Sequence, residues 1–308
     1  KNETYWGDPS NQNFDSIKYM FFSDDNIRAL ELEQGNLDIA LLNTNESIGR
    51  ISGMGEQGLA VSSVPLTKVG YFCMATIIED DTFQDVNKRL AIAHALDMDA
   101  IVSTIAGETA IAATSLFPSG SLGYADHSYE YDPELAKEYL EKAGCPNGFE
   151  FTIEVANNQQ MNLELAEAMQ AYLGQVGITM NIEPMDFGTQ FGNMLAGTQL
   201  CSILVGTCNG DPSMGLTAFA PGSGACIAEN HDEEFVRLLD ACRYERDPEI
   251  RLDYLAQLQT YMHDMAYAIP VYEAVYSLGY QSYVEGIEGA YIQGELGFYA
   301  ARLNFARG

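Results

Sequence analysis

The chain has 308 residues, about twice the length of a typical single domain, so its length predicts two lobes. Its 15 Lys and Arg residues against 44 Asp and Glu residues give a net charge of −29, which argues against nucleic acid and anionic lipid headgroups as partners. The hydrophobic fraction of 47% predicts sizeable folded cores, and no apolar run approaches the roughly 18 residues of a membrane span.

Strand-like and helix-like patterns alternate along the chain. In chain order the predicted elements are strand 14–22, helix 26–34, strand 37–42, extended segment 64–76, helices 83–96 and 99–105, helix 133–144, strand 149–155, helix 163–176, strand 178–185, helix 187–196, strand 201–205, helices 232–244 and 248–265, and an extended tail 269–283. Asp24 and the Asp132–Pro133 pair supply helix starts, and Gly35 supplies a helix end. This alternation predicts an α/β fold.

Motifs for catalysis are missing from the sequence. It contains no Gly-x-Ser-x-Gly elbow, no His-Glu-x-x-His pair and no phosphate-binding loop ending in Gly-Lys-Ser/Thr. The four histidines are scattered, with no pair at helical i, i+4 spacing. We therefore predict a ligand-binding protein that is not an enzyme and that uses no cofactor and no metal.

The six cysteines include no Cys-x-x-Cys pair, which excludes zinc ribbons and thioredoxin-like motifs. Two interpretations remain open for those around residues 201–226. They are buried free thiols, or Cys208 and Cys226 form a disulfide that pins a glycine-rich loop, which requires an oxidising compartment.

Several sequence blocks occur in an order that resembles the family 5 extracellular solute-binding proteins, the peptide- and nickel-binding receptors of ABC importers. The first block comprises residues 2–7, 24–25, 28 and 35–40, and the four that follow are residues 83–102, 131–144, 173–178 and 209–212. Each block alone is only weak evidence for the family, but the occurrence of all of them in the family's order over most of the chain is specific. The first block lies well inside the polypeptide in this family, so the resemblance implies a C-terminal fragment whose proximal lobe is missing its N-terminal part.

The resemblance implies an α/β, periplasmic-binding-protein-like clamp of class II type. Residues 1–76 and 268–308 would form the partial proximal lobe, and residues 77–267 the distal lobe. The two crossings would lie near 71–76 and 268–276, which are already predicted to be extended. The expected partners are a small solute or peptide and the permease subunits of an ABC importer. The protein would be exported, as a periplasmic protein or a cell-surface lipoprotein, and would touch a membrane only through a lipid anchor outside this chain.

The chain departs from the peptide-binding members of that family at their charged anchors. Aligned on Pro212, Cys208 stands where those members carry an Asp for the peptide ammonium group, and Val205 stands where they carry a Trp. Ala156 is nearest by spacing to the Arg that dipeptide binders use for the carboxylate, and no Arg occurs between residues 90 and 236. Because losing a buried charge partner costs about 3–5 kcal/mol, a short peptide held by both termini is not expected unless the missing part supplies the anchors.

The predicted ligand-binding residues fall into three chemical groups. The aromatic residues are Tyr71, Phe72 and Tyr276, the neutral polar residues are Asn157, Asn158, Gln159, Thr207, Cys208 and Asn209, and the acidic residues are Asp186 and Asp211. The aromatic side chains would line the cleft or pack in the core. The neutral groups suit hydroxyls, amides or a peptide backbone, and the acidic ones suit a cation, although Asp211 before Pro212 is also a common turn former.

Three functions are weighed from the sequence. The first is a receptor that captures a peptide or peptide-like solute for an ABC importer, or, in the same family, a metal chelate or an oligosaccharide. The second is an interaction module that has lost its ligand site. The third is a hydrolase or transferase that uses Cys208 as a nucleophile.

Overall fold

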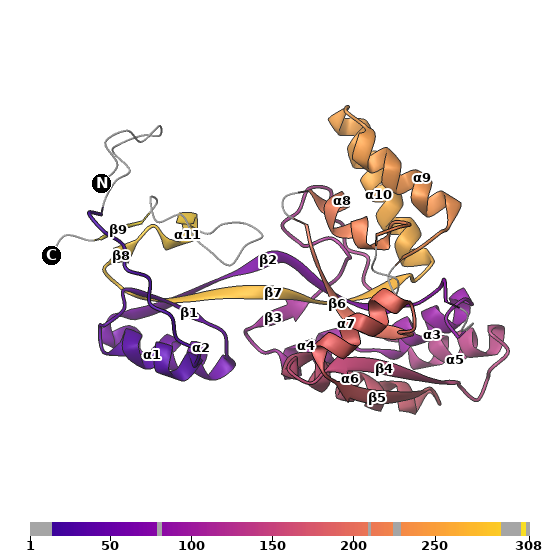
Figure 1. Cartoon of the computed structure of the whole chain (residues 1–308), viewed down its shortest axis with the longest axis horizontal. Helices are drawn as coiled ribbons and strands as arrows, with labels where there is room; N and C mark the ends of the chain where they lie inside the picture. The colour runs from indigo at the N-terminus through magenta and orange to yellow at the C-terminus, as the bar shows by residue number, and fades with distance from the viewer. Residues whose placement is uncertain (1–13, 79–81, 209–210, 224–228, 291–302, 306–308) are drawn as a thin grey trace. The chain divides into compact units, whose positions relative to one another are not determined.

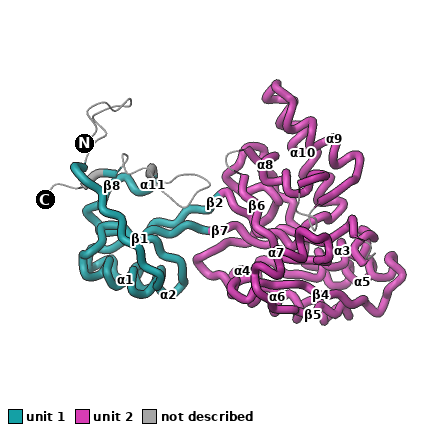
Figure 2. Tube along the Cα trace, viewed as in Figure 1, with its two compact units in different colours: residues 1–66, 275–308 teal, residues 67–274 magenta. Residues whose placement is uncertain are grey.

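The computed structural model describes residues 14–78, 82–208, 211–223, 229–290 and 303–305. The chain divides into two compact units, residues 1–66 with 275–308 and residues 67–274 (Figure 2). Two long strands, β2 (Leu59–Met74) and β7 (Ala268–Gln281), contribute residues to both units.

The first unit packs two short helices against a strand (Figure 1). Its main elements are α1 (Asp25–Glu33), β1 (Ile39–Leu42), α2 (Asn45–Ser52), the 3-10 turn η2 (Gly55–Gln57), β8 (Val284–Glu285), α11 (Ile287–Ala290) and β9 (Asn304–Phe305). β1 pairs antiparallel with β7, with Ile39 opposite Tyr280. Ala29, Leu32, Leu42, Ile48 and Ile51 form its small core. The Asp25 carboxylate links α1 to the start of α2, because it accepts hydrogen bonds from Thr44 and Ser47 and pairs with Arg28.

The predicted strand at residues 14–22 is wrong. This segment is irregular, and among its side chains Tyr19 is 67% and Phe21 is 96% exposed. It contains good β-forming residues, but β propensity stabilises a strand only where a neighbouring strand and a buried face are present, and neither is found beside the described residues of this segment.

The second unit contains antiparallel strand pairs and a parallel βαβ motif. β6 (Cys201–Thr207) pairs antiparallel with β2, from Lys68 opposite Thr207 to Met74 opposite Cys201, and β3 (Ala110–Ala112) pairs with β7. β4 (Glu150–Ala156) pairs parallel with β5 (Thr179–Met185) through the crossover helix α6 (Gln160–Gln175). The remaining elements are α3 (Val86–Ala95), α4 (Met98–Ile105), α5 (Pro133–Lys142), α7 (Phe187–Ala196), α8 (Pro212–Gly215), the 3-10 turn η3 (Leu216–Phe219), α9 (Glu233–Tyr244) and α10 (Pro248–Asp264).

Most helices of the second unit begin where the sequence predicts, because an aspartate caps them. Asp85, Asp97, Asp132, Asp186, Asp211, Asp232 and Asp247 each accept a hydrogen bond from a backbone N–H in the first turn of the helix that follows. Such a carboxylate satisfies an otherwise unpaired donor and interacts favourably with the helix dipole. α9 and α10 then lie side by side as a helical hairpin (Figure 1).

Arg89 joins the start of α3 to the end of α10 in the core of this unit. The residue is 2% exposed, and its guanidinium donates to the carbonyl oxygens of Met265 at 2.7 and 2.9 Å, Phe83 at 2.6 Å and Gln84 at 3.1 Å. It also lies over the ring of Tyr267, 5.1 Å from the centroid. Burial lowers the pKa of Arg89, yet its donors remain bonded to carbonyl oxygens.

Replacing Arg89 by Lys is expected to destabilise the chain by roughly 2 kcal/mol or more, because an ammonium group cannot reproduce the planar fork that reaches three carbonyl oxygens. Urea unfolding of the 308-residue chain measures the loss. The matched control is Arg243→Lys, where the arginine is 35% exposed and makes a 3.9 Å ion pair with Asp240. Equal midpoints for the two variants would contradict the assigned role of Arg89.

Candidate functional site

The candidate site is a pocket of about 310 Å³ in the second unit. Its walls come from β2, β6, the residue before α6, helix α7 and the turn η3. We call it the α7–β6 pocket, and its lining residues are Tyr71, Cys73, Gln159, Phe187, Gln190, Phe191, Met194, Gln199, Ile203, Leu204, Val205, Gly206, Ala218 and Phe219. None of these side chains carries a charge at neutral pH, so the described lining offers apolar contact and amide hydrogen bonds only.

Tyr71 is fixed in this wall by close packing. It lies on β2, is 2% exposed, donates from its phenol oxygen to the carbonyl of Leu116 at 3.2 Å, and packs edge-on against Phe219 with ring centroids 5.9 Å apart. A β-carbon at Gly206 on β6 would lie 2.4 Å from the Tyr71 ring. Only glycine therefore fits at that position while the ring stays in place.

Two phenylalanines on α7 form the apolar side of the pocket. Phe187 and Phe191 are one helical turn apart, their rings stack with centroids 6.1 Å apart, and both remain about half exposed. Val205 on β6 is 52% exposed and belongs to the same lining. The pocket therefore presents apolar surface that the rest of the unit does not cover.

Three glutamine amides supply the polar part of the lining. Gln159 precedes α6 and accepts a hydrogen bond from Asn162, and the Gln190 amide nitrogen donates to Ser202 at 2.9 Å and to the Glu154 carbonyl at 2.8 Å. Gln199 is 1% exposed and donates to the Glu154 carboxylate at 2.9 Å, whereas its Oε1 is buried with no hydrogen-bond partner among the described residues.

The predicted neutral residues do not all reach this pocket. Gln159 lines it, while Asn157 and Asn158 are exposed in the turn between β4 and α6. Thr207 ends β6 opposite Lys68 and is not in the lining. Asn209 and Cys226 lie outside the described residues, so the role of Asn209 and the Cys208–Cys226 disulfide stay predictions.

Two of the predicted aromatic residues lie elsewhere. Phe72 is fully buried and packs edge-on against Phe151, so it belongs to the core of the second unit. Tyr276 is a buried residue of the first unit, and burial raises its pKa.

Both predicted acidic residues are engaged within the chain. Asp186 caps α7 through the backbone N–H of Gly188 at 2.8 Å. Asp211 caps α8, and Arg251 of α10 donates to both of its carboxylate oxygens at 2.7 Å. Burial raises the pKa of Asp211, but hydrogen bonds from Ser213 and Arg251 outweigh it and hold the pKa below its ordinary value. Arg251 thus already neutralises Asp211, leaving little attraction for a ligand cation.

Cys208 is buried under the α8 turn. Its backbone N–H donates to the Thr67 carbonyl, its Sγ contacts the Pro212 carbonyl at 3.8 Å, and a β-carbon at Gly215 would lie 2.5 Å from that sulfur. Burial raises the pKa of the Cys208 thiol to about 12. A thiol of this kind is a poor nucleophile at neutral pH, which argues against the hydrolase hypothesis.

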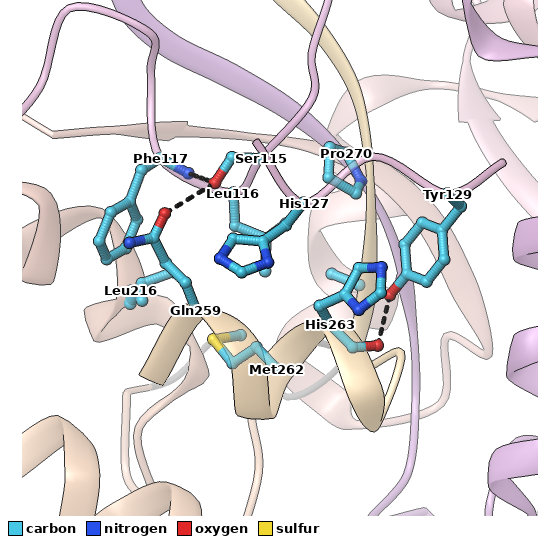
Figure 3. A pocket seen from close by; sticks show the side chains of 11 residues that line it. Ser115, Leu116, Phe117, His127, Tyr129, Leu216, Gln259, Met262, His263 and Pro270 are labelled. Carbon is cyan, nitrogen blue, oxygen red and sulfur yellow. Dashed lines mark hydrogen bonds between the residues drawn. The ribbon is translucent and has the colours of Figure 1, made fainter. Parts of the chain in front are cut away.

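A much smaller cavity, of about 10 Å³, lies beside α10 (Figure 3). The ring of His127 stands between the Gln259 side chain and His263, with the two imidazole centroids 5.8 Å apart (Figure 3). Tyr129 stacks on His263 at 4.3 Å and donates to its carbonyl oxygen at 2.7 Å. The volume of this cavity is close to the minimum for one water molecule, so the cavity is a packing feature rather than a solute site.

Neither a metal-binding cluster nor a membrane-spanning helix is found among the described residues. No cluster of three or more His, Cys, Asp or Glu side chains suited to a metal ion occurs in that part of the chain. No helix within the same residues combines the length and the apolar character needed to cross a membrane.

Sequence reasoning missed Phe187, Phe191 and Gln199. The two phenylalanines stand at i and i+4 in the helix predicted at 187–196, a spacing that indicates one shared face. The spacing alone cannot tell a core face from a pocket wall. Gln199 follows α7 in an irregular segment, so no sequence signal for it was available.

Cys208 is expected to resist iodoacetamide in the folded chain near neutral pH, because burial disfavours the reactive thiolate. Peptide mapping after brief labelling measures the modification of each cysteine. Cys145, which is half-buried, is the internal comparison and should react faster, and Cys208 should react fully in urea. Preferential labelling of Cys208 in the folded chain would contradict this environment.

The neighbouring histidines His127 and His263 are expected to make the free energy of unfolding depend on pH. Burial, and then the neighbouring His263, lower the pKa of His127 from 6.5, although Asp126 and Asp264 act in the opposite direction. The unfolded chain therefore binds a proton more readily than the folded chain, and stability falls as the pH drops below about 6.5. His127→Gln should lose less stability than the natural chain over that interval in urea unfolding. Superimposable pH profiles, or an NMR titration of His127 above 6.5, would contradict the assignment.

Comparisons with known proteins identify the family. The model described as "Bacterial extracellular solute-binding proteins, family 5 Middle" matches residues 1–225. The dipeptide-binding protein of Escherichia coli strain K12 is 25% identical over 276 residues, which cover 86% of this chain and 50% of that protein. The glutathione-binding protein GsiB of Escherichia coli O6:K15:H31 is 30% identical over 187 residues, which cover 60% of this chain and 35% of that protein.

Solved structures share the fold. The periplasmic binding protein DppA from Helicobacter pylori, in complex with the peptide STSA, superposes with a TM-score of 0.75 at 23% identity, covering 93% of this chain and 56% of that one. NikA from Brucella suis, in complex with Fe(III)-EDTA, gives a TM-score of 0.76 at 18% identity, and the match covers 92% of this chain and 60% of NikA.

The predicted α/β fold of a periplasmic binding protein is confirmed, and the chain spans about half the length of its relatives. The matched family consists of solute-binding proteins, which agrees with the prediction of a binder that is not an enzyme. Because the family model covers residues 1–225 of 308, the chain belongs to the bacterial extracellular solute-binding proteins of family 5.

Proposed function

We propose that this chain is the solute-capturing component of an ABC importer, and that it encloses a peptide or peptide-like solute for delivery to the permease. The observation that carries the proposal is the uncharged α7–β6 pocket in a chain of this family. The unit of residues 67–274 would contain the whole predicted distal lobe, 77–267, and residues 1–66 with 275–308 would be part of the proximal lobe. β2 and β7 would be the two crossings between the lobes.

Peptide-like ligands are favoured by the names of the relatives, which include a dipeptide-binding and a glutathione-binding protein. Backbone amides of a peptide would suit the glutamine side chains of the pocket. Charged termini would not, since Cys208 is a buried thiol and Ala156 is fully buried. The termini would have to be held by groups outside residues 67–274.

A non-peptide solute is the second candidate, supported by the same lack of charged anchors and by a fold shared with a protein bound to Fe(III)-EDTA. A metal chelate or an oligosaccharide would then replace the peptide. The third candidate is an interaction module that binds no solute. It too is supported by the lack of charged residues that could hold peptide termini. As for the family in general, we propose an exported protein, periplasmic or anchored to the cell surface by a lipid outside this chain.

The test is mass spectrometry of small molecules that co-purify with the complete natural polypeptide, followed by calorimetric titration of the compound found. We expect saturable binding with no chemical change in the bound compound. A series of peptides would support a receptor that reads peptide backbones, and one defined non-peptide mass would favour the second candidate. Catalysed conversion of the compound, or no solute at all, would contradict the proposal.

Gly206→Ala supplies the matched variant for that titration. The added β-carbon would lie within 2.4–2.8 Å of the Tyr71 ring and should displace it, weakening solute binding about tenfold. Gly192→Ala on α7 is the control, because a β-carbon there meets no atom within 4 Å. Unchanged affinity in Gly206→Ala would place the solute elsewhere.

A further inference from the structure

We propose that the α7–β6 pocket selects an uncharged aromatic or branched apolar group of the solute, and that Gln199 accepts a hydrogen bond from an N–H carried beside that group. The pocket's place in solute capture rests on the proposed function, whereas its chemistry follows from its own lining residues.

The apolar preference follows from the walls. Phe187 and Phe191 present a stacked pair of half-exposed rings, and Val205 and Met194 continue the same surface. Aromatic or branched groups bury the most apolar area against such rings. The volume of about 310 Å³ exceeds that of an engineered cavity of about 150 Å³ that holds benzene, so a ring with flanking atoms fits.

The rejection of charge follows from the same lining. No side chain among the lining residues is ionised at neutral pH, so an ammonium or carboxylate group entering the pocket would lose its hydration without gaining a charged partner. The nearest carboxylate in the hydrogen-bond network, Glu154, already accepts hydrogen bonds from Gln199 at 2.9 Å and from Asn193 at 3.1 Å.

The orientation of Gln199 gives the donor preference. A carboxylate only accepts hydrogen bonds, so the Gln199 amide nitrogen must face Glu154, and the carbonyl oxygen Oε1 must face away from it. That oxygen is buried and has no partner among the described residues, although Gln199 is a lining residue. A buried acceptor of this kind gains from a donor that the ligand brings.

The test uses uncharged and charged aromatic fragments as probes, so that it does not depend on knowing the natural solute. Acetanilide carries a phenyl ring and one N–H, N-methylacetanilide lacks that N–H, and benzoate and benzylammonium carry a charge. Carbon-13 methyl NMR of the complete natural polypeptide reports binding at Met194, which lines the pocket. Met214, which is 53% exposed and outside the lining, is the internal control.

Acetanilide is expected to shift the Met194 methyl signal saturably and to leave Met214 unchanged. Benzoate and benzylammonium should bind at least about tenfold more weakly, and N-methylacetanilide several-fold more weakly. Gln199→Met should remove the difference between acetanilide and N-methylacetanilide, while Gln175→Met, at an exposed position of α6, should keep it. Because the N-methyl probe tests the same hydrogen bond in the natural protein, the result does not depend on the folding of Gln199→Met.

Adding a charge to the pocket lining should reverse its preference for uncharged probes. Val205→Lys should bring benzoate to an affinity at least equal to that of acetanilide, and Ile250→Lys, which is as exposed but lies outside the pocket, should not. Equal binding of neutral and charged probes to the natural protein, or no shift of Met194 with acetanilide, would overturn the proposal. If acetanilide binds as expected but no solute is ever captured, the proposed function fails while the chemistry assigned to the pocket stands.

Discussion

The geometry of the candidate site depends on one close approach between two neighbouring strands. The ring of Tyr71 on β2 fills the space in which a side chain at Gly206 on β6 would stand, and the phenol is held from its far end by the Leu116 carbonyl. The antiparallel ladder sets this approach, because it pairs Tyr71 with Leu204 and Val69 with Gly206. Phe219 then packs on the ring and completes the wall.

Part of the negative charge of the chain has a structural role. Aspartates begin α1, α3, α4, α5, α7, α8, α9 and α10, where their carboxylates satisfy backbone donors. These eight of the 44 acidic residues therefore serve helix initiation. Asp186 and Asp211 are two examples: each could in principle attract a ligand cation, but each caps a helix instead.

The fold was largely predictable because local signals and tertiary packing agree. Capping aspartates, periodic apolar faces and alternating strands predicted most elements of residues 25–285 within a few positions. β3 and α8 are too short for a periodic signal, and α2 contains Gly49 and several other weak helix formers. The site was only partly predictable: Tyr71 and Gln159 line the pocket, but Phe72 faces the core. Adjacent residues on a strand point to opposite faces, and the sequence does not say which face carries the ligand. Gln199 reaches the pocket only through tertiary structure.

Arg89 gives the last turn of α10 an unusual property. The Met265 carbonyl that it binds lies three residues before β7 begins, and the intervening Ala266 has a positive φ of 45°. Helix ends normally fray first, but this one cannot open without breaking both hydrogen bonds that the buried Arg89 donates to the Met265 carbonyl. The segment that leads into the returning long strand should therefore exchange its amide hydrogens as slowly as the core, so that opening fluctuations are confined to other parts of the unit.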